Sequence, residues 1–157
     1  MRRSASFSSP GRAHRNRCLI PALAIAAGAL LMLHAPARAQ DLQQTLDRVA
    51  AAWHRGDVNA ITALAASAGM SVDVDGTAVG PLGQRQAAAV LRRVFDDRES
   101  VSARRSMSRT TGTDRAFGEI SWTVRAKGTT IPERATVFIA FIREDGSWRV
   151  SEIRLLQ

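Results

Sequence analysis

The chain has 157 residues and a formal net charge of +8, with one cysteine, three histidines and no tyrosine. Six of its 22 Lys and Arg residues, and none of its 14 Asp and Glu residues, lie in residues 1–39. The rest of the chain therefore carries 16 basic and 14 acidic residues, so the overall charge gives no support for nucleic-acid binding. Cys18 also lies in the first segment, which leaves the remainder without a thiol for a disulfide or a nucleophile.

The N-terminal segment has the three parts of a secretory signal peptide. Residues 1–17 hold five arginines, residues 18–35 are mostly apolar, and small residues follow at Ala37 and Ala39. This pattern predicts a signal peptide over residues 1–39, cut between Ala39 and Gln40, and export to the periplasm or the medium with no membrane attachment after cleavage. The alternative is an uncleaved N-terminal membrane anchor, although the apolar run is short for a span. Residues 40–157 are enough for one domain.

Two helices are expected at the start of this domain. In residues 41–55 the apolar side chains recur on one face, Asp41 with Gln44 resembles a capping box, and Gly56 marks the end. Asp57 is then expected to cap a second helix that reaches Gly69. Its inward residues are expected to be Val58, Ile61, Leu64 and Ala65.

Alternation predicts a half-buried strand over residues 70–75, followed by a connection through residues 76–83. A third helix is expected over residues 84–96, and four antiparallel strands over residues 101–110, 115–127, 133–143 and 147–156. Trp148 and Val150 have one parity and Ile153 and Leu155 the other, which predicts a β-bulge at Ser151 and Glu152. This order predicts an α+β domain in which three helices pack on a strongly curved antiparallel sheet.

Three segments resemble the nuclear transport factor 2-like superfamily, a cystatin-like α+β cone fold that includes the SnoaL-like proteins. They are AAWHRGDVNAITALAA (residues 51–66), GPLGQRQAAAVLRRVF (80–95) and the closing GSWRVSEIRLL. The last two are similar to a small exported group called domain of unknown function 4783. The resemblance implies a cone-shaped half-barrel whose cavity holds a ligand, an active site or only side chains, and it implies that dimers are common.

The residue types argue against the chemistry of the enzymes in this superfamily. An isomerase site of the ketosteroid type needs an acid or phenol donor and a carboxylate base, but the chain has no tyrosine and no acid at the inward positions of residues 120–124. His54 is the one histidine after residue 39. No catalytic residue and no cofactor are predicted. Asp73 and Asp75 are too few for a calcium loop, so no metal site is predicted either.

Six residues are candidates for lining a pocket. Arg105 and Arg109 share the parity of Met107 on one expected strand, where two arginines at a cavity mouth could hold an anion. The alternative is that both are solvated at the sheet edge. The other candidates, which are otherwise core residues, are Trp53, Phe95 and Trp122.

Residues 137–142 are apolar at both parities, whereas a strand with one wet face alternates. This run predicts a homodimer formed through the sheet. Three functions stay open: an exported non-catalytic module that binds a small ligand or a protein, a SnoaL-like small-molecule enzyme, and a homodimeric structural unit. An apolar groove favours the first, a polar-lined cavity the second and a cavity filled by aromatic side chains the third.

Overall fold

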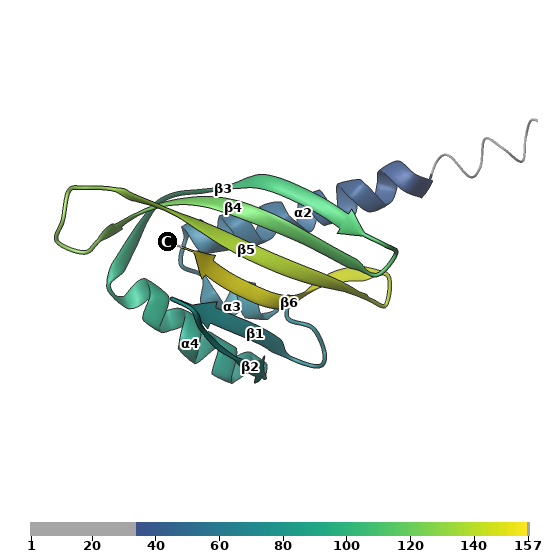
Figure 1. Cartoon of the computed structure of the whole chain (residues 1–157), viewed down its shortest axis with the longest axis horizontal. Helices are drawn as coiled ribbons and strands as arrows, with labels where there is room; N and C mark the ends of the chain where they lie inside the picture. The colour runs from purple at the N-terminus through teal and green to yellow at the C-terminus, as the bar shows by residue number, and fades with distance from the viewer. Residues whose placement is uncertain (1–33, 157) are drawn as a thin grey trace, which may run out of the picture.

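The structure is a computed structural model that describes residues 34–156, with side chains from Gln40 onward (Figure 1). Residues 1–33, most of the predicted signal peptide, lie outside the described residues. The first helix, α2, spans His34–His54 and is therefore longer than expected. Asp41 lies inside it, so the predicted capping box is wrong. Within this described part of the chain, no helix has the length and apolarity needed to cross a bilayer.

The second helix, α3, spans only Val58–Thr62. Asp57 caps it as predicted, because its carboxylate accepts a hydrogen bond from the backbone N–H of Ala60 at 3.0 Å. The expected extension to Gly69 is wrong. The backbone of Leu64 and Ala66 instead makes two hydrogen bonds with Val150, of 2.7 and 2.9 Å, which hold this segment against the sheet.

The expected connection after the first strand is itself a strand. β1 (Met70–Val74) and β2 (Thr77–Leu82) form an antiparallel hairpin, and α4 follows with the predicted bounds, Gln84–Asp96. Gly80 and Pro81 signalled a break in the sequence. Pro81 is tolerated because β2 is an edge strand, where a missing N–H can face solvent.

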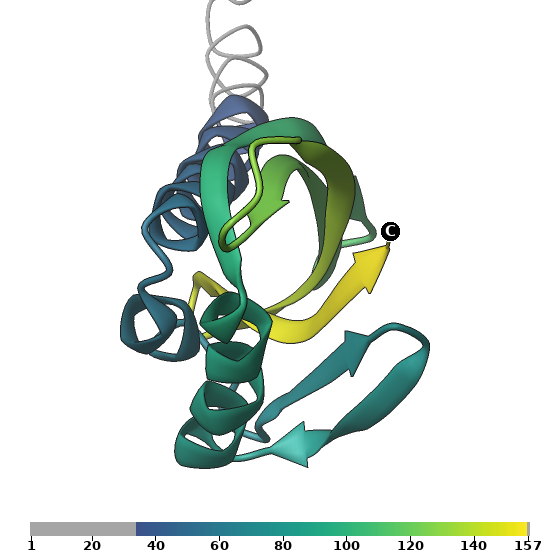
Figure 2. The same ribbon diagram turned by 90° about the vertical axis from the view of Figure 1, so that its left-hand side faces the viewer.

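The four later strands are β3 (Arg98–Thr111), β4 (Arg115–Ala126), β5 (Glu133–Glu144) and β6 (Ser147–Leu156). The described chain forms a six-stranded sheet in the order β2-β1-β6-β5-β4-β3, in which β1 runs parallel to β6. Figure 2 shows the sheet curling strongly, with the helices along one side. The predicted α+β cone is confirmed, with one more strand than expected.

The inner face of the sheet forms the core. Burial alternates along β4 and β5, and the pairing of β5 with β6 shifts between Ala140 and Phe141, whose partners are Glu152 and Val150. Ser151 is the extra residue, so the predicted bulge is confirmed. It lets Val150 and Ile153 both point into the core, where α2 and α4 cover the sheet.

Candidate functional site

Three of the predicted pocket residues meet inside the cone. The rings of Trp53, Phe95 and Trp122 lie edge to face, with centroids 5.2 to 5.9 Å apart. Trp53 comes from α2, Phe95 from α4 and Trp122 from β4, and the two indoles have no exposed surface. Aromatic pairs in this arrangement pack favourably, so at this level the cone is filled by side chains.

A small polar cluster lies at the edge of these rings. The indole N–H of Trp122 donates a hydrogen bond of 2.9 Å to the hydroxyl of Ser100, and Nδ1 of His54 lies 3.3 Å from the same oxygen. His54 is exposed. A general base is usually oriented by a carboxylate, whereas the partner of this nitrogen is a hydroxyl that already binds Trp122.

Arg105 does not face an open cavity. It lies opposite Ile120 on the sheet and forms a two-point ion pair with Asp47 of α2, through hydrogen bonds of 2.8 and 3.4 Å. The pair ties β3 to the helix. The guanidinium is therefore engaged in a contact within the fold.

The expectation that Arg105, Met107 and Arg109 share a face is wrong. The pairing of β3 with β4 shifts between Arg105 and Met107, so that Met107 lies opposite Glu119 and Arg109 opposite Phe117. Glu119 and Phe117 lie at positions of β4 whose side chains point away from the core. The shift is a bulge at Ser106, whose hydroxyl donates a hydrogen bond to the carbonyl of Glu119 at 3.2 Å. Met107 and Arg109 thus lie on the outer face of the sheet.

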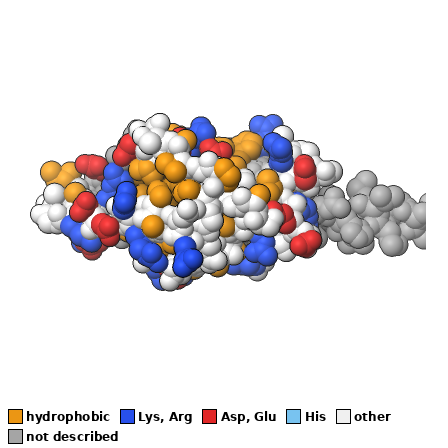
Figure 3. All heavy atoms as spheres, turned by 90° about the horizontal axis from the view of Figure 1, so that it is seen from below, with side chains coloured by type: hydrophobic (Ala, Val, Ile, Leu, Met, Phe, Trp, Pro, Cys, Tyr) orange, Lys and Arg blue, Asp and Glu red, His pale blue; other side chains and the backbone are white. Residues whose placement is uncertain are grey.

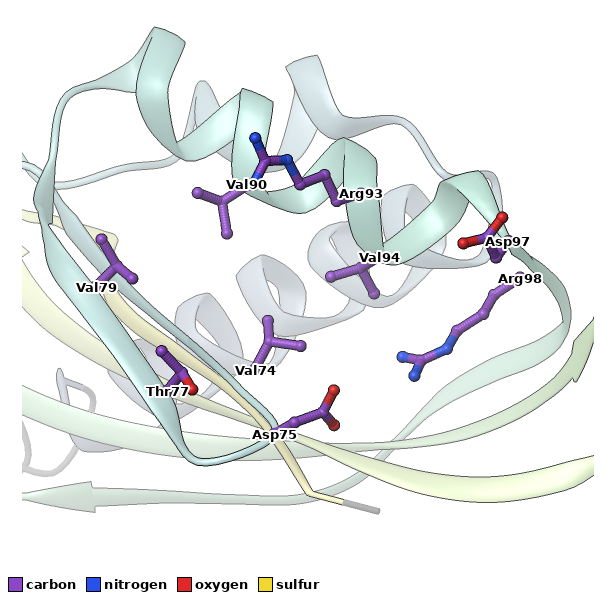
Figure 4. A pocket seen from close by; sticks show the side chains of 9 residues that line it. All are labelled: Val74, Asp75, Thr77, Val79, Val90, Arg93, Val94, Asp97 and Arg98. Carbon is purple, nitrogen blue, oxygen red and sulfur yellow. The ribbon is translucent and has the colours of Figure 1, made fainter.

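The structure instead opens a cleft between α4 and the β1–β2 hairpin. Its volume is about 360 Å³. We call it the hairpin cleft, and it is lined by Val74, Asp75, Thr77, Val79, Val90, Arg93, Val94, Asp97 and Arg98. Figure 3 shows this side of the molecule, where hydrophobic side chains gather and charged side chains border them. Figure 4 shows the four valines converging from the helix and the hairpin.

The hairpin cleft was missed in the sequence because β2 was taken for a connection. Thr77 and Val79 share a strand face, and that short alternation was the available signal. Val90 and Val94 recur at helical spacing within residues 84–96, but such an apolar stripe alone does not show whether it packs against core or borders a cleft.

One ion pair beside the cleft perturbs a carboxyl group. Glu99 follows Arg98 on β3 and accepts two hydrogen bonds from Arg125 of β4, of 2.8 and 3.0 Å. These bonds, with the charge of Arg125, lower the pKa of Glu99, and the pKa of Arg125 is raised in return. Both side chains are exposed on the outer face, so the pair belongs to the surface and not to the cleft.

Among residues 40–156, no three His, Asp or Glu side chains are grouped so that they could hold a metal ion. No family model matches the sequence, and no curated protein matches it.

Solved structures do match. A ketosteroid isomerase-like protein from Erwinia carotovora atroseptica is 20% identical with a TM-score of 0.62, over 74% of this chain and 92% of that one. A protein of the domain of unknown function 4783 family from Bacteroides uniformis is 11% identical with a TM-score of 0.60, over 70% and 94%.

A third match, from Catenulispora acidiphila, is 18% identical with a TM-score of 0.57, over 71% of this chain and 83% of that one. It is described as having a ketosteroid isomerase-like fold and as a complex with trimethylamine. At these identities the likeness concerns the fold, and it agrees with the resemblance carried by residues 51–66 and 80–95. The chain has the nuclear transport factor 2-like fold.

Proposed function

We propose that the protein is an exported, non-catalytic module that binds a small molecule in the hairpin cleft. The observation that carries the proposal is a contrast between two places in the cone. The interior is filled by Trp53, Phe95 and Trp122, whereas the cleft beside it is open and has a floor of four valines.

The size and lining of the cleft fit this role. Ligand pockets usually measure about 300–1,000 Å³ and combine an apolar surface with a few polar groups. The volume of the hairpin cleft lies near the lower end of that range, so the cleft fits a compound of a few carbon atoms better than a large cofactor. The trimethylamine complex supports the same idea, because it shows a small molecule held by a protein with this type of fold.

The absence of catalysis is proposed from the surroundings of His54. Its Nδ1 lies against Ser100, and the fully buried rings of Trp53 and Trp122 fill the space between α2 and β4. Binding without chemistry needs only the shape and polarity of the cleft.

The test uses isoamyl alcohol, an uncharged branched probe, and follows the backbone amide signals by NMR. We expect shifts at Val79, Val90 and Val94, which Val79→Asp removes. Val101→Asp is the matched control, because Val101 is 46% exposed and Val79 42%, and Val101 lies outside the cleft. Shifts confined to other residues, or lost equally in both variants, would contradict the proposal.

A second proposal concerns the outer face of the sheet, where we infer that a second copy of the chain binds. The rings of Phe117 and Phe138 stack at 5.6 Å on this face, and Ala140 and Ile142 continue the stripe along β5. All four side chains are half-buried. A contiguous apolar stripe that stays partly open to solvent favours an interface, and a two-fold partner would cover it with the same stripe.

A further inference from the structure

The hairpin cleft is apolar at one end. The side chains of Val79, Val90 and Val94 converge there with Val74 from β1 (Figure 4). Their branched methyl groups form a short, wide floor. Burying a branched aliphatic group of a few carbons on such a surface is favourable because it removes apolar area from water. The floor therefore selects the size and the apolar character of one end of a ligand.

The other end of the cleft carries two opposite charges. Figure 4 shows the carboxylate of Asp75 and the guanidinium of Arg98 pointing toward one another. Asp75 lies at the turn of the hairpin and Arg98 begins β3, so the two groups come from separate elements. Two further charged residues line the cleft, Arg93 and Asp97. Figure 4 shows Asp97 on the same side as Arg98, whereas the guanidinium of Arg93 lies near Val90.

This charge arrangement discriminates between ligand heads. A head with a single charge is attracted by one member of the Asp75 and Arg98 pair and repelled by the other. A head that carries both signs on neighbouring atoms matches both groups, since a carboxylate pairs well with a guanidinium and an ammonium with a carboxylate. A ligand that matches both the apolar floor and the charged end of the cleft is a small zwitterion with an aliphatic side chain.

We propose that the hairpin cleft binds an apolar α-amino acid of the leucine type as its zwitterion. This inference rests on the proposed function of the cleft. The ligand carboxylate faces Arg98, the ammonium faces Asp75, and the branched side chain lies on the four valines. Neither charged group of the ligand is then left without a counter-charge.

The test compares three compounds with the same branched chain by calorimetry and amide NMR. L-leucine has both charges, isocaproate lacks the ammonium and isoamylamine lacks the carboxylate. We expect leucine to bind about tenfold or more tightly than either, because each lost contact is a charge-assisted hydrogen bond. Tighter binding of isocaproate would overturn the inference in favour of a simple anion.

Two variants separate the two contacts. Arg98→Gln should weaken leucine without weakening isoamylamine, and Asp75→Asn should weaken leucine without weakening isocaproate. Asparagine suits position 75, since the residue there has a φ of 55°. Arg85→Gln, an exposed arginine on α4 outside the cleft, is the control and should change nothing.

The outcomes distinguish this inference from the proposed function. If the three compounds and isoamyl alcohol bind the cleft equally, the zwitterion is wrong and a binding cleft remains. If none of them shifts the amides of Val79 or Val90, both proposals fail.

Discussion

Trp53 and Trp122 meet edge to face, with ring centroids 5.5 Å apart and planes at 89°, and so join α2 to β4, the strand beside the sheet edge. Both are fully buried. Trp122→Ala should therefore lower the free energy of unfolding by about 3–5 kcal/mol, as for other large core aromatics. Urea unfolding measures this loss of stability. The control is Thr123→Ala, at the neighbouring outward position, which should change the free energy of unfolding only slightly. A near-wild-type transition for Trp122→Ala would contradict the packing.

The protein should show no turnover of keto-steroid or hydroxy-ketone substrates. His54 contacts a hydroxyl through Nδ1, and the chain has no tyrosine to supply the phenol of an oxyanion site. Assays of the purified protein, with His54→Ala beside it, check this. Robust activity that disappears in His54→Ala would refute the non-catalytic proposal.

Glu99 should titrate below the usual range of a glutamate. Its hydrogen bonds from Arg125 favour the ionised form, which lowers its pKa. A carboxyl with a lowered pKa in the folded state contributes stability above its unfolded pKa, and that contribution is lost as the pH falls through the folded pKa. NMR of the side-chain carboxyl carbon measures the titration. Arg125→Ala should return the pKa toward its ordinary value, and an unchanged value would show that the pair does not persist in water.

Much of this fold was predictable because its signals are local. The stripe of α4 and the alternation of β4 need only the neighbouring residues, and the parity change from Val150 to Ile153 was enough to place the bulge at Ser151. The long-range features were not predictable in the same way. The shift at Ser106 leaves no parity change in the apolar residues of β3, since that strand is mostly polar. The sequence therefore predicts one face for Arg105, Met107 and Arg109, whereas the bulge separates Arg105 from the other two.

The candidate site depended on tertiary packing to a greater degree. Trp53, Phe95 and Trp122 are pocket or core candidates in the sequence, but their positions do not show that the three rings meet or that they fill the cone. The hairpin cleft needed β2, and the Gly80-Pro81 pair masked that strand. Where a strand pairs on one side only, turn-forming residues are compatible with it.

The mature protein should begin at Gln40. The small residues at positions 37 and 39 follow an apolar run and match the preference of signal peptidase. Cleavage there would remove the first turns of α2 and leave Leu42 and Leu46, which are buried in the core, in place. The intact mass of the exported protein measures the new N-terminus. A full-length product bound to the membrane would support the anchor instead.

Phe138 and Phe141 lie on opposite faces of β5, which allows a sharp test of the proposed dimer. Phe138 is half-buried on the outer face against Phe117, whereas Phe141 is 1% exposed in the core. Phe138→Glu should give a folded monomer. Phe141→Glu should unfold the chain, because an unpaired charge is then buried. Sedimentation equilibrium at micromolar concentration, together with circular dichroism, separates the two outcomes, and a monomeric wild type would contradict the proposal.

The charged residues around the apolar stripe of β4 and β5 predict how salt changes the affinity of the dimer. Its direct cross-strand neighbours on the outer face include two glutamates, Glu119 and Glu152, and four arginines, Arg109, Arg115, Arg149 and Arg154. Because arginines outnumber glutamates here, two copies that meet through this face bring two net-positive surfaces together. Their repulsion falls as ions screen it, with a Debye length of about 8 Å at physiological ionic strength. The dimer should therefore tighten as sodium chloride is raised. A dimer that dissociates with salt would be held by ion pairs, and the apolar stripe would not be its interface.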